Sequence, residues 1–390
     1  MKIGIDARFW GHAGPGRYVK NLVLALEKVD HENEYVIFLN PKGLEDYKAS
    51  NPNFKKVGVN IPWYYFGEQL KLPFIFTREK LDLLHIPHYN IPIFYPGKIA
   101  VTIHDLTIRR FSTARSTTRV IPIYRLKRLV YRFVFWLAVK RAKNIFVPTK
   151  FGRNDLLATY SWLDSKKILV THEGVGEEFK VQDTKYEIRD TEKNNIEYQI
   201  LNTKYNIRPP YILYVGSMYP HKNLPRLIKA FKLVSEEYED LSLVLVGKQD
   251  FFQERLRKEI RNTRRVIFPA FRVPDGYVPD EELSIFYRKA LFFILPSLSE
   301  GFGLPPLEAM SFGVPVAASS ATSIPEVCGG AALYFDPRDV DDIARKMKSL
   351  IKNSTLREDL INKGFENLER FSWEKMARQT LEGYIDCLAV

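Results

Sequence analysis

Residues 291–310 read LFFILPSLSEGFGLPPLEAM. The apolar run Leu291–Pro296 has the length of a buried strand, and a loop containing two glycines separates it from Pro305 and Pro306. Proline suits the first turn of a helix, because the N–H that it lacks would have no partner there. The stretch therefore predicts a strand, a glycine-containing loop and a helix in succession, as in parallel α/β folds.

The same alternation of apolar runs and helical stretches continues through most of the chain. In the first half the strand candidates are Lys2–Ala7, Tyr35–Asn40, Leu83–Pro87, Ile99–His104, Ile145–Pro148 and Lys167–Thr171. In the second half they are Tyr211–Gly216, Ser242–Gly247, Val266–Phe268, Leu291–Pro296, Val314–Ala318 and Ala332–Phe335. One helix is marked by the apolar spacing of Leu224, Leu227, Ile228, Phe231 and Val234. We therefore expect an α/β protein with doubly wound, Rossmann-like parallel sheets.

The chain is long enough for two domains. Its 390 residues exceed what one hydrophobic core usually serves. Between Val181 and Pro210 the apolar rhythm is lost in polar sequence, and a new strand is expected at Tyr211. We expect an N-terminal domain over 1–180, a linker over 181–210 and a C-terminal domain over 211–371. Ligands of such sheets bind beyond the carboxyl ends of the strands, so the two domains are expected to face a central cleft.

The charge is +12, and part of it is concentrated in one segment. No acidic residue occurs between Asp105 and Asp155, whereas thirteen Lys and Arg residues lie there. One interpretation is an amphipathic helix packed on the domain, with a solvated basic face. The other is a helix that lies on an anionic membrane and presents a lipid-linked acceptor.

Several classes of protein are disfavoured. The N-terminus lacks the apolar core of a signal peptide, and no apolar run approaches the roughly 20 residues that span a bilayer. Two cysteines, Cys328 and Cys387, are too few for a disulfide framework or a zinc site, so we expect free thiols in the cytoplasm. No RNA-recognition, zinc-finger or helix-turn-helix signature is present, so we expect no nucleic-acid partner. The first strand is not followed by G-x-G-x-x-G, which disfavours a dehydrogenase.

Two glutamates flank the glycine loop. Glu300 is expected at its mouth and Glu308 in the helix that follows. Gly301 and Gly303 let the backbone approach a ligand, and the helix N-terminus favours an anion. Carboxylates at this position suit hydrogen bonding to sugar and ribose hydroxyls. Alternatively, Glu308 complements the helix dipole and Glu300 is solvated; the whole pattern after a buried strand favours a ligand site.

A second loop, in residues 211–224 (YILYVGSMYPHKNL), follows another expected strand. Lys222 lies just before a helix, where its positive charge suits a diphosphate, although an isolated lysine there is usually solvated.

The N-terminal half contributes two further candidates. Gly16 belongs to the glycine-rich turn Gly11–Tyr18. Taken alone, such a turn does not indicate a ligand site. His104 ends the strand Ile99–His104, where ligands of α/β sheets collect, although it could also be structural.

Together these residues resemble the retaining glycosyltransferases of family four, which have the two-domain GT-B fold. The family has two glutamates separated by seven residues, here Glu300 and Glu308. Further matches are Gly216 and Ser217 with Lys222-Asn223-Leu224, Gly-Val-Pro-Val at 313–316, and Ile-Pro-Glu-Val at 324–327. Phe371-Ser372-Trp373-Glu374 resembles the start of the family's last helix, which implies that residues 372–390 pack back on the N-terminal domain.

The resemblance also implies that the N-terminal domain, 1–180, binds the acceptor and that the C-terminal domain, 211–371, binds the nucleotide sugar. It implies roles for individual residues as well. Glu308 would hold the ribose of the donor, Glu300 a hydroxyl of the transferred sugar, and Lys222 the diphosphate. His104 would face the transferred sugar. The remaining donor-binding positions implied are Gly16, Gly216, Gly301, Phe302, Gly303 and Leu304. Many relatives have a phosphate-binding arginine where this chain has Ser217, and His221 would partly replace that arginine.

The overall pattern is most similar to bacterial mannosyltransferases, which implies GDP-mannose as the favoured nucleotide-sugar donor and a glycan or lipid-linked glycan as acceptor. A UDP-sugar such as UDP-glucose, or a nucleotide-sugar epimerase of the same plan, remains an alternative. Asp339-Val340-Asp341 matches the Asp-x-Asp pattern of metal-dependent transferases, but it precedes a helix and predicts capping. Because Lys222 and a helix dipole suffice for the diphosphate, we expect no metal and no other cofactor.

Overall fold

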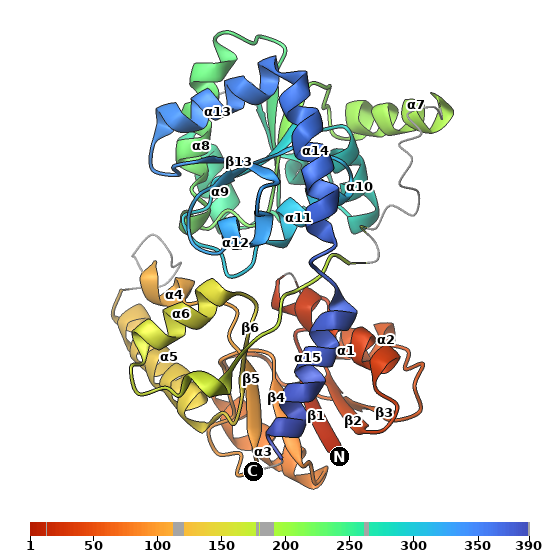
Figure 1. The fold of residues 1–390 in the computed structure, drawn as a ribbon, viewed down its shortest axis with the longest axis vertical. Helices are drawn as coiled ribbons and strands as arrows, with labels where there is room; N and C mark the ends of the chain where they lie inside the picture. The colour runs from red at the N-terminus through yellow and green to blue at the C-terminus, as the bar shows by residue number, and fades with distance from the viewer. Residues whose placement is uncertain (13, 112–120, 177–178, 180–190, 261–264, 389–390) are drawn as a thin grey trace. The chain divides into compact units, whose positions relative to one another are not determined.

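The computed structural model describes the chain except for residues 13, 112–120, 177–178, 180–190, 261–264 and 389–390 (Figure 1). The chain divides into two compact units. The first contains the described residues of Met1–Arg110, Arg119–Gly174 and Phe371–Val390. The second contains those of Phe111–Thr118 and Val175–Arg370.

The first unit is built on a parallel sheet with the strand order β3-β2-β1-β4-β5-β6-β7. The strands are β1 Lys2–Ala7, β2 Glu34–Leu39, β3 Phe54–Gly58, β4 Leu83–Ile86, β5 Ile99–Thr102, β6 Ile145–Val147 and β7 Ile168–Val170. The central strand β4 is buried along its whole length, as expected for a parallel sheet covered on both faces.

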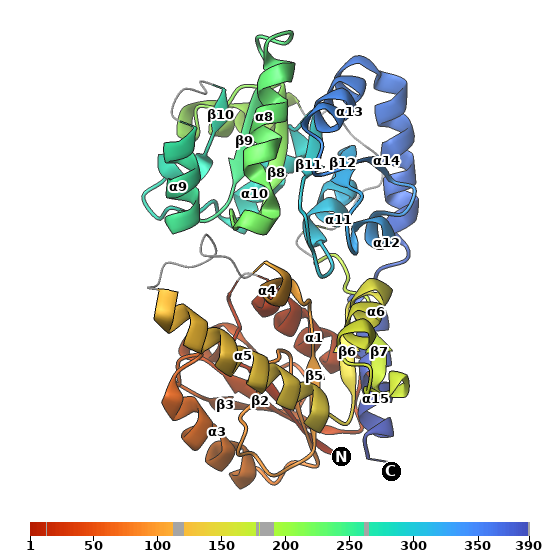
Figure 2. The ribbon, with the colours of Figure 1, turned by 90° about the vertical axis from the view of Figure 1, so that its left-hand side faces the viewer.

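Helices cover both faces of this sheet. The helices are α1 Pro15–Val29, α2 Pro41–Asp46, α3 Phe66–Arg78, α4 Thr107–Arg110, α5 Ile121–Arg141, α6 Lys150–Thr159 and α15 Trp373–Asp386. Helices α3 and α5 share one core with Leu84 and Ile86 of β4, and Figure 2 shows both helices in front of the strands. Side chains alternate along a strand, so His85 points to the opposite face, where it contacts Tyr384 of α15.

One strand was missed by the sequence prediction. β3, at the edge of the first sheet, pairs with β2 through positions such as Tyr35 and Phe54. Its sequence, FKKVG, carries two lysines and only its first residue is buried. An edge strand satisfies its backbone on one side only and needs no continuous apolar run, so its pattern is weak.

The second unit is also built on a parallel sheet, with the strand order β10-β9-β8-β11-β12-β13. The strands are β8 Tyr211–Val215, β9 Ser242–Val246, β10 Val266–Ile267, β11 Phe292–Leu295, β12 Val316–Ser319 and β13 Ala332–Phe335. The helices are α7 Thr191–Gln199, α8 Leu224–Ser235, α9 Phe251–Glu259, α10 Asp280–Arg288, α11 Leu304–Ser311, α12 Ile324–Cys328, α13 Val340–Lys352 and α14 Ser354–Leu368. The predicted apolar face of α8 is buried. The expected architecture of two Rossmann-like α/β units is thus confirmed.

The predicted linker contains local structure. Residues 181–190 of it lie outside the described part of the chain. Helix α7 and a π-helical turn, Ile200–Lys204, precede β8 and belong to the second unit. Glu197 of α7 pairs with Arg288 at 2.6 Å and with Lys289 at 2.8 Å, which fastens α7 to the end of α10.

Both sheets reverse their winding at one pair of central strands. In the first sheet β1 is followed along the chain by its neighbour β2, while its other neighbour is β4. In the second sheet β8 has the same relation to β9 and β11. The loops that leave two such strands diverge to opposite sides, which opens a crevice at the carboxyl edge of the sheet. Ligand sites are therefore expected after β1 and β4 and after β8 and β11.

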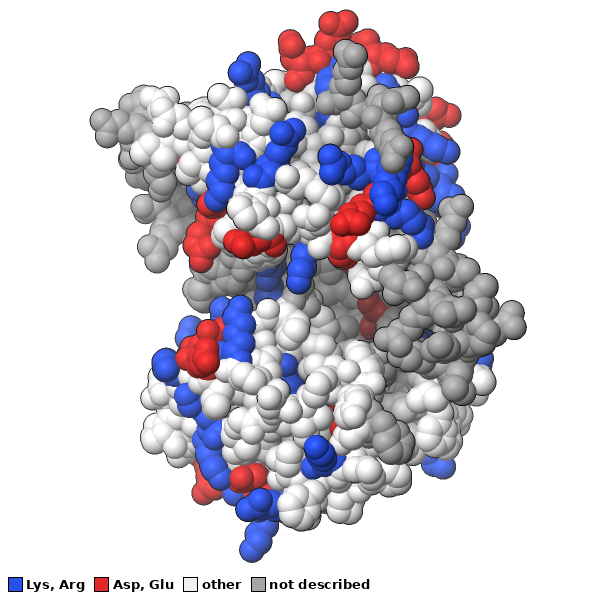
Figure 3. Space-filling view, turned by 180° about the vertical axis from the view of Figure 1, so that it is seen from behind, with Lys and Arg blue, Asp and Glu red and all other residues white. Residues whose placement is uncertain are grey.

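The segment without acidic residues contains α5. Its C-terminal half packs into the first core through Phe135, Ala138 and Val139. Its described N-terminal half instead exposes Leu129, Val130 and Phe133. On the face of the molecule in Figure 3, the described Lys and Arg side chains are interspersed with acidic and uncharged ones. Among the described residues, no helix has both the length and the apolar character that crossing a bilayer requires.

Candidate functional site

Two loops meet at the carboxyl ends of β8 and β11 in the second unit. Asn223, at the start of α8, donates through Nδ2 to the carbonyl oxygens of Pro296 at 3.0 Å and Pro337 at 2.6 Å. The Leu298 N–H donates to the carbonyl oxygen of His221 at 2.8 Å. These bonds hold the loop after β8 against the loop after β11, and so they fix where their side chains can lie.

Lys222 and Glu300 form an ion pair across these loops. The Lys222 ammonium lies 2.7 Å from Glu300 Oε1 and 2.8 Å from Oε2. Ser297 Oγ donates to Glu300 Oε1 at 2.6 Å. The Lys222 side chain remains 18% exposed and that of Glu300 11%, so the pair lies close under the surface. The structure therefore brings these two predicted residues together.

The environment of Glu300 keeps its carboxylate ionised. Burial is the largest influence and by itself would raise the pKa of Glu300. The charge of Lys222, the hydrogen bonds from Lys222 and Ser297, and the charge of His221 outweigh burial, so the pKa lies below its ordinary value. An ionised carboxylate is an acceptor only, which suits it to hold the hydroxyl groups of a ligand.

The backbone of the glycine loop is also fixed. The Glu300 N–H donates to Thr322 Oγ1 at 3.1 Å, and Ser323 Oγ donates to the Glu300 carbonyl oxygen at 2.9 Å. Gly303 caps α11 with φ +96°, a conformation that favours glycine. Of the predicted donor-binding positions here, Phe302 is buried and Gly301, Gly303 and Leu304 are half-buried.

Glu308 lies deeper than Glu300. It sits on α11, is 2% exposed, and accepts a hydrogen bond from the Tyr287 hydroxyl of α10 at 2.8 Å. The two glutamates of the predicted pair thus differ in accessibility, because Glu300 lies on the loop and Glu308 on the covered side of the helix.

The remaining predicted positions of the second unit follow β8. Gly216 has φ +150°, and its carbonyl oxygen would lie 2.4 Å from a Cβ at Gly247. Ser217 is half-buried and its carbonyl oxygen accepts the Tyr214 hydroxyl at 2.6 Å. The His221 ring is half-buried and nearly parallel to that of Tyr219, at 5.9 Å between centroids. These residues belong to the same loop after β8 as Lys222.

His104 and Gly16 belong to the first unit. His104 Nε2 lies 3.2 Å from the Pro87 carbonyl oxygen, and Nδ1 lies 3.5 Å from the buried carboxylate of Glu173. Gly16 is buried in the first turn of α1, where an added Cβ would lie 2.2 Å from the Phe9 carbonyl oxygen. Close packing therefore requires glycine at position 16, independently of the predicted donor contact.

Sequence reasoning missed the residues that hold the glutamates in place. They are Ser297, Thr322 and Ser323 around Glu300, and Tyr287 beside Glu308. Ser297 lies within the quoted strand–loop–helix stretch, and Thr322 and Ser323 directly precede the Ile-Pro-Glu-Val match. Tyr287 had no local signal, because only the packing of α10 on α11 brings it to Glu308.

Asp339 caps α13 as predicted, accepting the N–H groups of Asp341 at 2.9 Å and Asp342 at 3.1 Å. Within the described part of the chain, no group of three His, Cys, Asp or Glu side chains is arranged to hold a metal ion.

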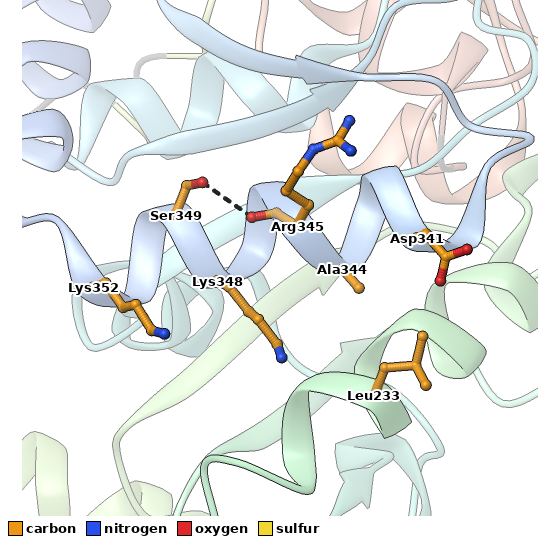
Figure 4. A pocket seen from close by; sticks show the side chains of 7 residues that line it. All are labelled: Leu233, Asp341, Ala344, Arg345, Lys348, Ser349 and Lys352. Atoms are coloured by element: carbon orange, nitrogen blue, oxygen red, sulfur yellow. Dashed lines mark hydrogen bonds between the residues drawn. The ribbon is translucent and has the colours of Figure 1, made fainter.

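A shallow pocket between α8 and α13 is drawn in Figure 4. It is lined by Leu233, Asp341, Ala344, Arg345, Lys348, Ser349 and Lys352. Lys348 and Lys352 pair with Glu237 at 2.7 and 2.8 Å. None of the predicted site residues lines this pocket, and we assign it no function.

Comparisons with known proteins identify the family. Residues 13–179 match the model of Glycosyltransferase Family 4, and residues 199–367 match that of Glycosyl transferases group 1. The chain is 32% identical over 386 residues to O-antigen chain mannosyltransferase B of Escherichia coli, covering 95% of both chains. It is 31% identical over 253 residues to the serotype-specific mannosyltransferase WbdA of Escherichia coli, which is 63% of this chain but 29% of that one.

The fold also matches solved structures. Sucrose-phosphate synthase from Thermosynechococcus elongatus superposes with a TM-score of 0.74 at 19% identity, over 100% of this chain and 99% of that one. At this identity the likeness concerns the fold alone. With the sequence matches, it leads to one conclusion: the chain belongs to glycosyltransferase family 4, has the GT-B fold, and is a glycosyltransferase similar to bacterial mannosyltransferases.

Proposed function

We propose that this glycosyltransferase moves mannose from GDP-mannose to a glycan or lipid-linked glycan acceptor, with retention of the anomeric configuration. The observation that carries the proposal is the Lys222–Glu300 pair at the point where the second sheet reverses its winding. The names of the relatives above, which are mannosyltransferases, support mannose as the transferred sugar.

The pair supplies what transfer from a nucleotide diphosphate requires. The bond between the anomeric carbon and the diphosphate oxygen breaks, and negative charge develops on the leaving group. The Lys222 ammonium stabilises this charge, as does the N-terminus of α11. A diphosphate that binds Lys222 releases Glu300 from its ion pair, and the carboxylate then holds a hydroxyl of the transferred sugar.

Retention follows from attack on the face that the leaving group departs from. The acceptor oxygen bonds to the anomeric carbon, and its proton passes to the departing phosphate oxygen. Glu300 positions the sugar in this scheme and forms no covalent bond with it. His104 contacts the transferred sugar and Glu308 the ribose. Lys222 and the helix dipole neutralise the diphosphate, so transfer needs no divalent cation.

Two alternative activities are distinguished by their substrates. A UDP-sugar such as UDP-glucose would change the base and the sugar and leave the role of Lys222 intact. A nucleotide-sugar epimerase of the same plan would convert the donor without an acceptor.

The proposed donor site is tested by substitution in the ion pair. Purified wild-type protein is incubated with GDP-mannose, UDP-glucose and other nucleotide sugars, with and without glycan acceptors, and products are measured by mass spectrometry. We expect acceptor-dependent consumption of GDP-mannose. Lys222→Ala and Glu300→Gln should each lower kcat about 100-fold or more, the range for loss of one preorganised charge stabiliser.

Lys229→Ala, which removes an exposed lysine from α8, the helix that follows Lys222, is the matched control and should keep wild-type turnover. Unchanged turnover in Lys222→Ala would refute the assignment. Donor conversion without acceptor would replace it with epimerase activity.

We also propose that the enzyme works in the cytoplasm, in peripheral contact with an anionic membrane surface. This proposal is supported by Leu129, Val130 and Phe133 of α5, which are 64%, 55% and 53% exposed beside Arg128 and Arg132. A membrane contact at this helix would place a lipid-linked acceptor close to the first unit.

A further inference from the structure

An aromatic cluster lies where the first sheet reverses its winding. Phe9 follows β1, His88 follows β4, and Trp63 and Tyr64 precede α3. The Phe9 and Trp63 rings stack at 3.7 Å between centroids, and the His88 ring lies 5.1 Å from Phe9 and 6.2 Å from Tyr64. None of these four residues was predicted as a site residue. Phe9 and His88 occupy in the first sheet the place that Lys222 and Glu300 occupy in the second, and Trp63 and Tyr64 join them from the segment after β3.

The cluster presents both aromatic surface and hydrogen-bonding groups. Tyr64 is 58% exposed, and Phe9 and Trp63 are half-buried. His88 Nδ1 accepts the Asn90 N–H at 3.2 Å, and burial, together with the charge of His104, lowers the pKa of His88 to about 3. The ring is therefore neutral with its proton on Nε2, which lies 3.5 Å from the Tyr64 hydroxyl.

A buried network of charges holds this cluster rigid. The Arg8 guanidinium, 1% exposed, pairs with Asp6 and with Glu68, each at 2.8 Å. It also lies 4.0 Å from the centre of the Trp63 ring, on which it stacks. Glu68 Oε2 accepts the Tyr64 N–H at 2.9 Å. Buried ion pairs are a weak source of stability, but they define geometry well when fully hydrogen-bonded.

The backbone at Tyr64 is strained. Its φ is +61°, which is uncommon for a bulky residue that is not glycine. Such a conformation persists only where neighbouring groups enforce it, and these positions gather at ligand sites. Here the Glu68 hydrogen bond enforces it, and the result is an exposed tyrosine ring beside His88.

We propose that Phe9, Trp63, Tyr64 and His88 form the subsite that holds a pyranose ring of the acceptor glycan. The proposal rests on the proposed function. A pyranose has a face of C–H groups that packs on aromatic rings, and equatorial hydroxyls that bond to an exposed group such as the Tyr64 hydroxyl, which the buried His88 ring holds through Nε2. The subsite adjoins His104, whose Nε2 contacts the carbonyl oxygen of Pro87, the residue before His88.

The test measures sugar binding directly and does not depend on turnover. Saturation-transfer NMR is recorded on the full chain with the methyl glycosides of mannose, glucose, galactose and N-acetylglucosamine. At least one should bind wild-type protein. Tyr64→Ala and Phe9→Leu should each weaken that binding roughly tenfold, which corresponds to the loss of one aromatic contact. Binding of GDP, followed in parallel, should stay unchanged.

Trp162→Ala is the matched control, because it removes a half-exposed aromatic ring from the same unit before the edge strand β7, away from β1 and β4 in the sheet. Tyr64→Phe, which retains the ring, should weaken sugar binding less than Tyr64→Ala. The proposal is overturned if no glycoside binds, if Tyr64→Ala and Phe9→Leu behave like Trp162→Ala, or if they weaken GDP binding instead. If the protein binds a glycoside at this subsite but transfers sugar from no nucleotide sugar, the subsite proposal holds and only the proposed function is refuted.

Discussion

The Lys222–Glu300 pair explains how a carboxylate can remain charged in a half-closed loop. Burial opposes ionisation of Glu300, and the charge of Lys222 is the strongest of the influences that favour it. Neither side chain would be stable there alone, because an unpaired charge under the surface loses hydration without compensation. The pair therefore keeps the Glu300 carboxylate ionised, and substrate groups can replace each partner of the pair.

This balance predicts a pH dependence. The pKa of Glu300 is lower in the folded than in the unfolded state, so its contribution to folding stability is present above the unfolded pKa and is lost as pH falls through the folded pKa. In urea denaturation followed from pH 7 towards acid, wild type should lose more stability than Glu300→Gln. Equal acid slopes for the two proteins would contradict this prediction, because they would show that the pKa of Glu300 is the same in the folded and unfolded states.

At the scale of single elements, α5 has two halves with different surroundings. Phe135, Ala138 and Val139 anchor the C-terminal half in the first core. The described turns before them expose Leu129 and Phe133 among arginines. A solvated amphipathic helix places its polar face outward, so solvation alone does not explain why these apolar side chains are exposed.

If that reason is a membrane, binding should depend on both charge and apolar contact. Wild-type protein should co-sediment with vesicles rich in phosphatidylglycerol and dissociate as salt is raised. Arg128→Gln with Arg132→Gln should weaken binding by about 1 kcal/mol for each charge. Leu129→Ser with Phe133→Ser should weaken it at every salt concentration.

The control for the apolar change is Leu44→Ser, because Leu44 is exposed on α2. Equal binding to neutral and anionic vesicles would contradict the membrane proposal.

At the scale of the whole molecule, the chain leaves the first unit after Gly174 and returns to it at Phe371. Helix α15 packs on α1, and the Asn144 side chain donates to the Gly383 carbonyl oxygen at 2.8 Å. The stability of the first unit therefore depends on residues at the end of the chain.

Gly383→Val tests this dependence. A Cβ at position 383 would lie 2.5 Å from Leu169 Cδ1 and 2.7 Å from Phe146 Cε1. The overpacking should cost the first unit about 1–3 kcal/mol. Hydrogen exchange read by mass spectrometry should show faster exchange in β6 and β7, with β8 and β11 unchanged. Gly330→Ala is the control, because an added Cβ there meets nothing within 4 Å, and it should change exchange in neither unit. Faster exchange throughout the chain in Gly383→Val would contradict the expectation that the effect is confined to the first unit.

The sequence by itself determined the local order of strands, loops and helices. The apolar run before Pro296 and the prolines after Gly303 act within a few residues, so their structural effect is visible in the pattern. The edge strand β3 was not visible, because two lysines interrupt its apolar pattern and its outer side needs no partner. Glu300, Glu308 and Lys222 could be predicted as candidates because each lies in a loop or helix that follows a recognisable strand.

Only the tertiary structure decided which strand ends meet. Lys222 and Glu300 are 78 positions apart, and they pair because β8 and β11 are neighbours in the sheet. Phe9 and His88 meet for the same reason, since β1 and β4 are neighbours. Strand order is set by how crossover helices pack over a whole sheet, and this packing depends on contacts between distant residues. No local pattern reports it, so the aromatic cluster became visible only in the folded chain.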